Sequence, residues 1–105
     1  MFVPTAVAAK QTQIKAVIAD AMAEFAPSVQ RINYEIAQDW SGDWAVFFRV
    51  LLSDEASERK KLRDITKRIM SRMTERLDLP ELGLFPYFDF RSQSEQAKQE
   101  EPAWA

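Results

Sequence analysis

The sequence contains no cysteine, no histidine and only two glycines among its 105 residues. Without cysteine the chain can form neither a disulfide framework nor a zinc-thiolate or iron–sulfur site. Without histidine it lacks the usual general base near neutral pH and the commonest ligand of transition metals. Two glycines are too few for a glycine-rich loop that cradles phosphate groups. We therefore expect neither a bound metal nor a cofactor.

No strong excess of charge is present either, because 14 Lys and Arg residues face 16 Asp and Glu residues, a net charge of -2. The chain is 47% hydrophobic, which is ordinary for a globular protein and too apolar for disorder. No apolar run is long enough to cross a bilayer. The first nine residues lack a basic segment and contain Pro4, so we expect no signal peptide, no membrane segment and a cytoplasmic location.

Hydrophobic periodicity predicts a helix followed by two strands. Residues 5–25 carry an apolar stripe at helical spacing, with Thr5 as a predicted N-cap. Residues 31–36 alternate between apolar and polar, which is typical of a half-buried strand. After a polar loop, residues 44–52 are apolar on both faces, which favours a central strand.

A second helix and a third strand complete the pattern. Ser53 is the predicted N-cap of the helix, which ends at Leu79-Pro80. The strand runs from Leu84 to Arg91, and Pro86 within it indicates an edge strand or a bulge. We therefore predict an α+β fold, a two-layer αββαβ sandwich. Its three-stranded, mainly antiparallel sheet carries two helices on one face. Residues 1–91 form a single domain, and residues 92–105 a polar C-terminal tail.

The strand alternation separates two faces of the sheet. One is apolar and should take the helices; its residues are Ile32, Tyr34, Ile36, Val46, Phe48, Val50, Leu52, Leu84, Phe88 and Phe90. The other is rich in aromatic and arginine side chains. No helix is left to cover this second face. Its candidate partner-binding residues, with one tryptophan from the tail, are Arg31, Phe47, Arg49, Leu51, Phe85, Tyr87, Arg91 and Trp104.

Three interpretations of this face remain open. The tail can fold back so that Trp104 covers its apolar part, which would make the face ordinary core. The face can bind a protein partner or a second copy, because aromatic residues and arginine are enriched in interfaces. It can also stack RNA bases on Phe47, Phe85 and Tyr87, with arginines holding phosphates.

The second helix carries the only basic segment, but acids are interleaved with its cations at helical spacing. A solvated helix face is the favoured interpretation, which weakens the RNA alternative. Asp39, Asp43 and Asp54 are the acids that could serve catalysis. The segment from Asp39 to Asp43 is better explained as a turn, and Ser41 has no base to activate it. We expect no enzyme and no catalytic residue.

Four segments of the chain form a recognisable pattern: 39–43 (DWSGD), 47–57 (FFRVLLSDEAS), 82–84 (LGL) and 86–96 (PYFDFRSQSEQ). In these segments the chain resembles a small bacterial family of uncharacterised proteins. The resemblance implies that the gene lies beside one for a HEPN-type helical protein, in an arrangement like a toxin–antitoxin or defence module. It also implies an antitoxin-like or accessory role. Together with the uncovered face, it favours a non-catalytic protein–protein interaction module whose partner is a HEPN-type protein or a second copy. A small RNA-binding α+β domain is the alternative.

Overall fold

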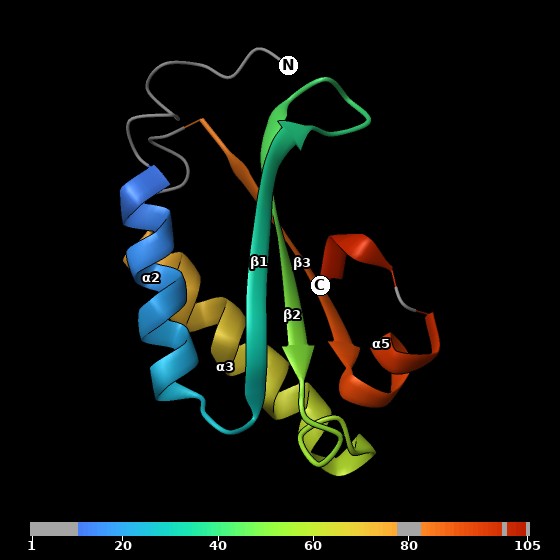
Figure 1. Cartoon of the computed structure of the whole chain (residues 1–105). Helices are drawn as coiled ribbons and strands as arrows, with labels where there is room; N and C mark the ends of the chain where they lie inside the picture. Colours follow the sequence, from blue (N-terminus) through green and yellow to red (C-terminus); the bar gives the residue numbers. More distant parts are fainter. Residues whose placement is uncertain (1–10, 78–82, 100, 105) are drawn as a thin grey trace.

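The computed structural model describes residues 11–77, 83–99 and 101–104. It has the predicted α+β class, with a sheet and helices in separate layers (Figure 1). Along the chain the elements are α2 (Gln11–Glu24), β1 (Val29–Gln38), β2 (Trp44–Leu52), α3 (Arg59–Arg76), β3 (Phe85–Ser92), α5 (Gln93–Gln99) and the 3₁₀ turn η1 (Pro102–Trp104). None of the helices in these residues is long and apolar enough to span a membrane.

The sheet has strand order β1-β2-β3 and is mixed, not mainly antiparallel as predicted, because one of its two strand pairings is parallel. β2 pairs antiparallel with β1 through a hairpin and parallel with β3 through the α3 crossover. The apolar strand β2 is central, as predicted from its two apolar faces. β3 is an edge strand, which accommodates Pro86 because an edge strand needs backbone donors on one side only.

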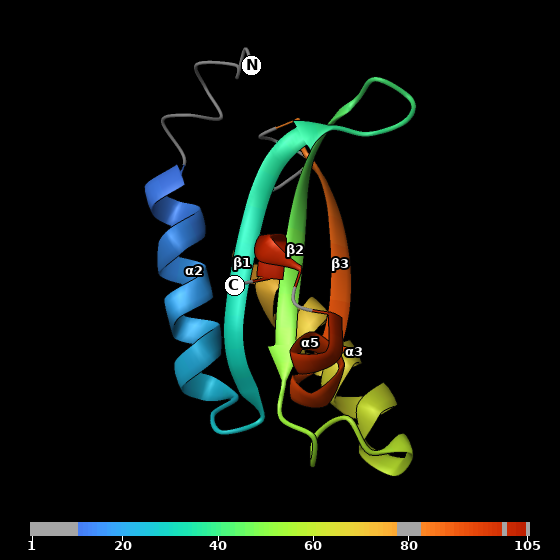
Figure 2. The same cartoon turned by 45° about the vertical axis from the view of Figure 1, so that its right-hand side comes forward.

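Helices α2 and α3 cover one face of the sheet, and their apolar stripes meet the predicted apolar side chains of the strands (Figure 2). The largest fully buried side chains come from α2, α3 and the central strand: Phe48, Ile14, Leu52, Ile69, Met73, Val46 and Val50. Three ion pairs on the surface join the helices, between Arg72 and Glu24 and between Arg76 and both Asp20 and Glu24. The core therefore lies between this helical layer and the sheet.

The predicted start of the second helix was wrong. The Ser53 side chain does accept a hydrogen bond at 3.1 Å from the Ala56 backbone, as an N-cap would. It closes an isolated turn, however, and α3 begins only at Arg59, after Glu58. β1 is longer than the predicted strand 31–36, and β3 is shifted by one residue from 84–91. The predicted N-cap Thr5 and the predicted helix end at Leu79-Pro80 lie outside the described residues.

The C-terminal segment crosses the sheet face opposite α2 and α3 (Figure 2). α5 follows β3 directly, and its first turn is tied to the segment after β2. The Asp54 carboxylate accepts hydrogen bonds from the Ser94 backbone at 2.9 Å and hydroxyl at 2.6 Å. These bonds lower the pKa of Asp54. Residues 93–99, assigned to the polar tail by sequence, are thus helical and anchored.

Candidate interaction surface

The face opposite the helices is organised in cross-strand rows set by the pairing register. From the hairpin end of the sheet, the rows are Ala37–Ala45–Phe85, Glu35–Phe47–Tyr87, Asn33–Arg49–Asp89 and Arg31–Leu51–Arg91. Seven of the eight predicted site residues lie in these rows, and the eighth, Trp104, comes from the C-terminal segment. The structure divides them into a covered half and an open half.

The covered half lies under the C-terminal segment. Trp104 is buried, and the Arg91 guanidinium lies over its ring, 4.5 Å from the centroid. Arg91 also donates hydrogen bonds to Gln96 at 3.0 Å and to Glu101 at 3.3 Å. The interpretation in which the tail folds back thus describes this half. Leu51, in the same row, is half-buried, whereas Arg31 at the far edge is exposed.

The open half carries four aromatic side chains, Trp40, Phe47, Phe85 and Tyr87, here called the aromatic patch. The rings of Phe47 and Tyr87 are stacked with centroids 5.2 Å apart, and Trp40 meets Tyr87 at 5.6 Å with tilted planes. Trp40 is 85% exposed and Phe85 is 53% exposed. Large aromatic side chains in contact with solvent are characteristic of binding surfaces, where they act as anchors.

The hairpin loop holds Trp40 in place. The Asp39 carboxylate accepts hydrogen bonds from the Ser41 backbone, the Ser41 hydroxyl and the Asp43 backbone, at 2.6–3.1 Å. Gly42 adopts φ +87°, a conformation that favours glycine. The Tyr87 hydroxyl donates to the second oxygen of Asp39 at 2.9 Å and links the loop to β3. The turn interpretation of this segment therefore accounts for its polar side chains.

These hydrogen bonds lower the pKa of Asp39, chiefly through the Ser41 hydroxyl and then Tyr87, and Asp39 in turn raises the pKa of Tyr87. Because the pKa of Asp39 is lower in the folded state, these hydrogen bonds stabilise the fold fully above pH 3.8, the ordinary pKa of the group. Their contribution to stability is lost as the pH falls through the lower pKa of the folded state.

We predict that Tyr87→Phe raises the pKa of Asp39 toward 3.8 and leaves the stacked ring in place. NMR titration of the carboxyl carbon measures this shift, and an unchanged pKa would contradict the contact.

Acidic groups surround the aromatic patch. Asp39 and Asp43 lie in the loop, and Asp89 lies in the row below. The nearest predicted cation, Arg49, is half-buried and already forms an ion pair with Glu35 at 2.9 Å. The open half therefore presents aromatic rings within a negatively charged border.

The acidic side chains of the hairpin loop and Ser41 are hydrogen-bonded to one another. The described part of the chain holds no group of three or more His, Cys, Asp or Glu side chains that could bind a metal ion. The Ser41 hydroxyl lies 2.6 Å from Asp39 and 3.0 Å from Asp43 and closes an exposed turn.

Sequence reasoning missed Trp40 as a site residue, because a residue in a hairpin loop belongs to no strand face. The signal was present nevertheless: a single tryptophan among Asp, Ser and Gly residues has no local apolar neighbour to bury it.

No known protein family, curated protein or solved structure matches the chain.

Proposed function

We propose that this protein is a non-catalytic interaction module that binds a protein partner through its aromatic patch. The single observation that carries the proposal is the pair of exposed aromatic side chains Trp40 and Phe85, which share the open half of the sheet face with the stacked Phe47 and Tyr87. Exposing two such rings costs free energy that burial against a partner recovers, at about 25 cal/mol per Å² of apolar surface.

The charges around the patch support a protein partner over RNA. Three carboxylates, those of Asp39, Asp43 and Asp89, lie close to the rings on which bases would have to stack. RNA binding depends on cations that neutralise phosphates, and Arg49 on this face is already paired with Glu35. A partner surface that combines apolar and basic groups complements the patch.

The same charges disfavour a second copy of this chain. Face-to-face pairing of two patches would bring like carboxylates together, and like-charge contacts across an interface cost several kcal/mol. The resemblance to proteins encoded beside a HEPN-type helical protein makes such a protein the first partner to test. An antitoxin-like or accessory role in the cytoplasm follows from that resemblance as part of the same proposal.

The test compares three tagged forms of the chain in the organism that encodes it: wild type, Trp40→Ser/Phe85→Ser and Met70→Ser. Met70 is 36% exposed on α3 and serves as the matched control, since it is an exposed apolar side chain away from the patch. We expect wild type and Met70→Ser to retain one stoichiometric protein with or without nuclease. The double variant should lose at least about tenfold in retention, because interface anchors contribute about 2 kcal/mol or more each.

Two outcomes contradict the proposal. Bound material that disappears with nuclease would favour the RNA alternative. Equal retention by the double variant and wild type would show that the partner binds elsewhere. Circular dichroism of all three forms checks that the substitutions leave the fold intact, as expected for exposed side chains.

A further inference from the structure

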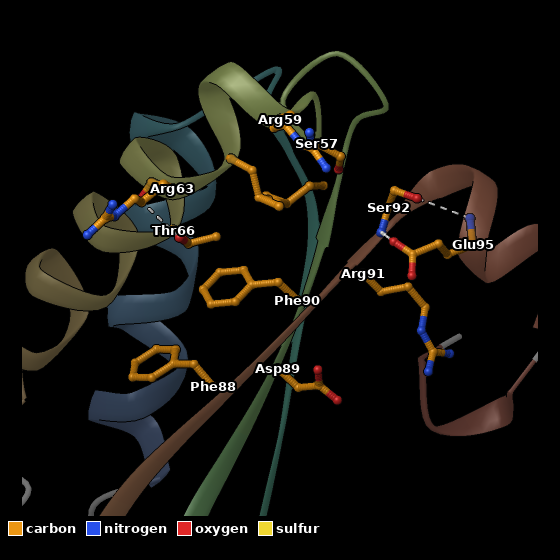
Figure 3. Close-up of a pocket in the computed structure, with 12 residues that line it drawn as sticks. Ser57, Arg59, Arg63, Thr66, Phe88, Asp89, Phe90, Arg91, Ser92 and Glu95 are labelled. Carbon is orange, nitrogen blue, oxygen red and sulfur yellow. Dashed lines mark hydrogen bonds between the residues drawn. The ribbon is translucent and has the colours of Figure 1, made fainter.

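A second surface lies on the other side of β3, in a groove of about 650 Å³ between this strand and α3 (Figure 3). Phe88 and Phe90 project from β3 toward the helix and form the apolar floor, and both are only half-buried. Leu62, 37% exposed, and Thr66 line the helical wall. The groove runs along a sheet edge with which no strand in the described residues pairs.

Backbone alternation shows which groups this edge offers. Asp43 and Ser53 flank β2 in the sequence. The Asp43 carbonyl accepts a hydrogen bond from the Asp39 N–H at 2.9 Å, and the Ser53 N–H donates to the Ser28 carbonyl at 2.8 Å. Both residues therefore direct their backbone groups toward the β1 side. Alternation along the strand therefore directs the backbone of Phe48 toward β3. In a parallel pair, a residue whose N–H and C=O face the neighbouring strand bonds to the two residues on either side of its aligned partner. The aligned partner then directs its own N–H and C=O away from the pair. Phe88 is the residue aligned with Phe48. Phe88 and Phe90 thus direct their N–H and C=O groups outward, beside the groove that their rings line.

The outward edge is limited at both ends. Pro86, two residues before Phe88, has no N–H to donate. Ser92, two residues after Phe90, donates its N–H to the Glu95 carboxylate at 3.1 Å. The available donors are therefore those of Phe88 and Phe90, which suits one short extended segment. A short free edge of this kind also resists unspecific sheet pairing.

The charges beside the groove define the chemistry of the occupant. Arg59 and Arg63 line it from α3, and neither forms an ion pair with another described residue. This distinguishes them from Arg72 and Arg76 farther along the helix, which pair with acids of α2. Asp89, Arg91 and Glu95 also line the groove. The Asp89 carboxylate points away from the rings of Phe88 and Phe90 (Figure 3). Arg91 is paired with Glu101, and the Glu95 carboxylate accepts the Ser92 N–H at the end of the strand. Two cations without an acidic partner among the described residues, beside an apolar floor, favour an occupant with acidic and apolar side chains.

We propose that the β3 edge and this groove bind an extended acidic peptide segment of a protein partner by strand addition. The segment pairs with the backbone of Phe88 and Phe90, packs small apolar side chains on their rings and places carboxylates near Arg59 and Arg63. A second copy of this chain fits less well, because antiparallel pairing of two β3 edges would put two basic α3 helices on one face. The site is separate from the aromatic patch.

The probe is the blocked heptapeptide Ac-Glu-Thr-Val-Thr-Val-Thr-Glu-amide. Its alternate side chains place two valines over the floor and a glutamate at either end, so it matches the groove in both strand directions. The control Ac-Lys-Thr-Val-Thr-Val-Thr-Lys-amide has the same apolar content. In ¹H–¹⁵N NMR titrations of the labelled protein, we expect the acidic peptide to shift the backbone amide resonances of Phe88 and Phe90. The basic peptide should bind about tenfold more weakly, since it replaces the two solvated ion pairs with Arg59 and Arg63 by two like-charge contacts.

Two variants in the groove and one control variant in the aromatic patch test the assignment independently of folding defects. Arg59→Glu/Arg63→Glu should reverse the preference, so that the basic peptide binds more tightly than the acidic one. Leu62→Ser should weaken both peptides severalfold, whereas Trp40→Ser/Phe85→Ser should leave them unchanged.

Three results would overturn the proposal. One is the absence of amide shifts at Phe88 and Phe90 at millimolar peptide, and another is equal binding of both peptides. The third is a dimer in sedimentation whose Phe88 and Phe90 amides are already protected from exchange, which would assign the edge to a second copy. A negative result at this groove would not contradict the function proposed for the aromatic patch, because that proposal is tested with different variants and by retention of a partner.

Discussion

Replacing Phe48 with alanine will lower the free energy of unfolding by about 3–5 kcal/mol. Phe48 is 1% exposed at the centre of β2, and its ring stacks on that of Phe88 with centroids 5.1 Å apart. Truncation removes the transfer free energy of a buried ring and leaves a cavity between the sheet and the helices. Chemical denaturation measures the loss. For a domain of this size, about 5–15 kcal/mol of total stability is typical, so the loss is a substantial fraction of it.

Phe85→Ala is the matched control for this substitution. It removes the same side chain from the same sheet, but from a position that is 53% exposed on the aromatic patch. We expect it to lower the free energy of unfolding by only about 0.5–1 kcal/mol, because about half of the residue stays in contact with solvent on folding and no closed cavity is left. Equal losses for the two variants would mean that Phe48 is not the centre of the core.

Periodicity predicted the core and the sheet faces because both depend on local alternation. The side chains that the sequence assigned to the helix-covered face, such as Ile32, Val46 and Phe48, are buried. The same rule cannot tell how fully helices cover a face. Phe88 and Phe90 were assigned to the covered face as well, yet α3 leaves them half-buried at the edge strand. Helix placement depends on packing between distant segments, which a single-strand pattern does not contain.

The open face was predicted as one surface and proved to be two. The pleat correctly grouped Phe47, Tyr87 and Arg91 on one side of the sheet. It could not place the C-terminal segment, because its position depends on long-range contacts such as the Asp54–Ser94 hydrogen bonds. The start of α3 was misplaced for a related reason: Ser53 satisfies a local capping rule in a turn that does not propagate.

The second large effect is expected at the C-terminal segment. Trp104→Ala should lower the free energy of unfolding by about 2–4 kcal/mol, somewhat less than a central core truncation, because a detached segment limits the loss. Trp104 is 3% exposed, and its ring also holds the Arg91 guanidinium, a cation–π contact that contributes about 0.5–2 kcal/mol. Without the ring, residues 93–104 should separate from the sheet while the core stays folded.

Hydrogen exchange and trypsin cleavage after Lys98 report that separation directly. Trp40→Ala is the matched control, because it removes the same side chain from a site that is 85% exposed and should change stability by no more than about 0.5 kcal/mol. Faster exchange in α5 of the Trp104 variant alone would show that this ring fastens the segment to the sheet. If both tryptophan variants left α5 equally protected, the Asp54–Ser94 hydrogen bonds would be the main attachment instead. The two outcomes also bear on binding. A segment fastened by Trp104 restricts a partner to the aromatic patch, whereas its release would extend that surface across Leu51 and Arg91.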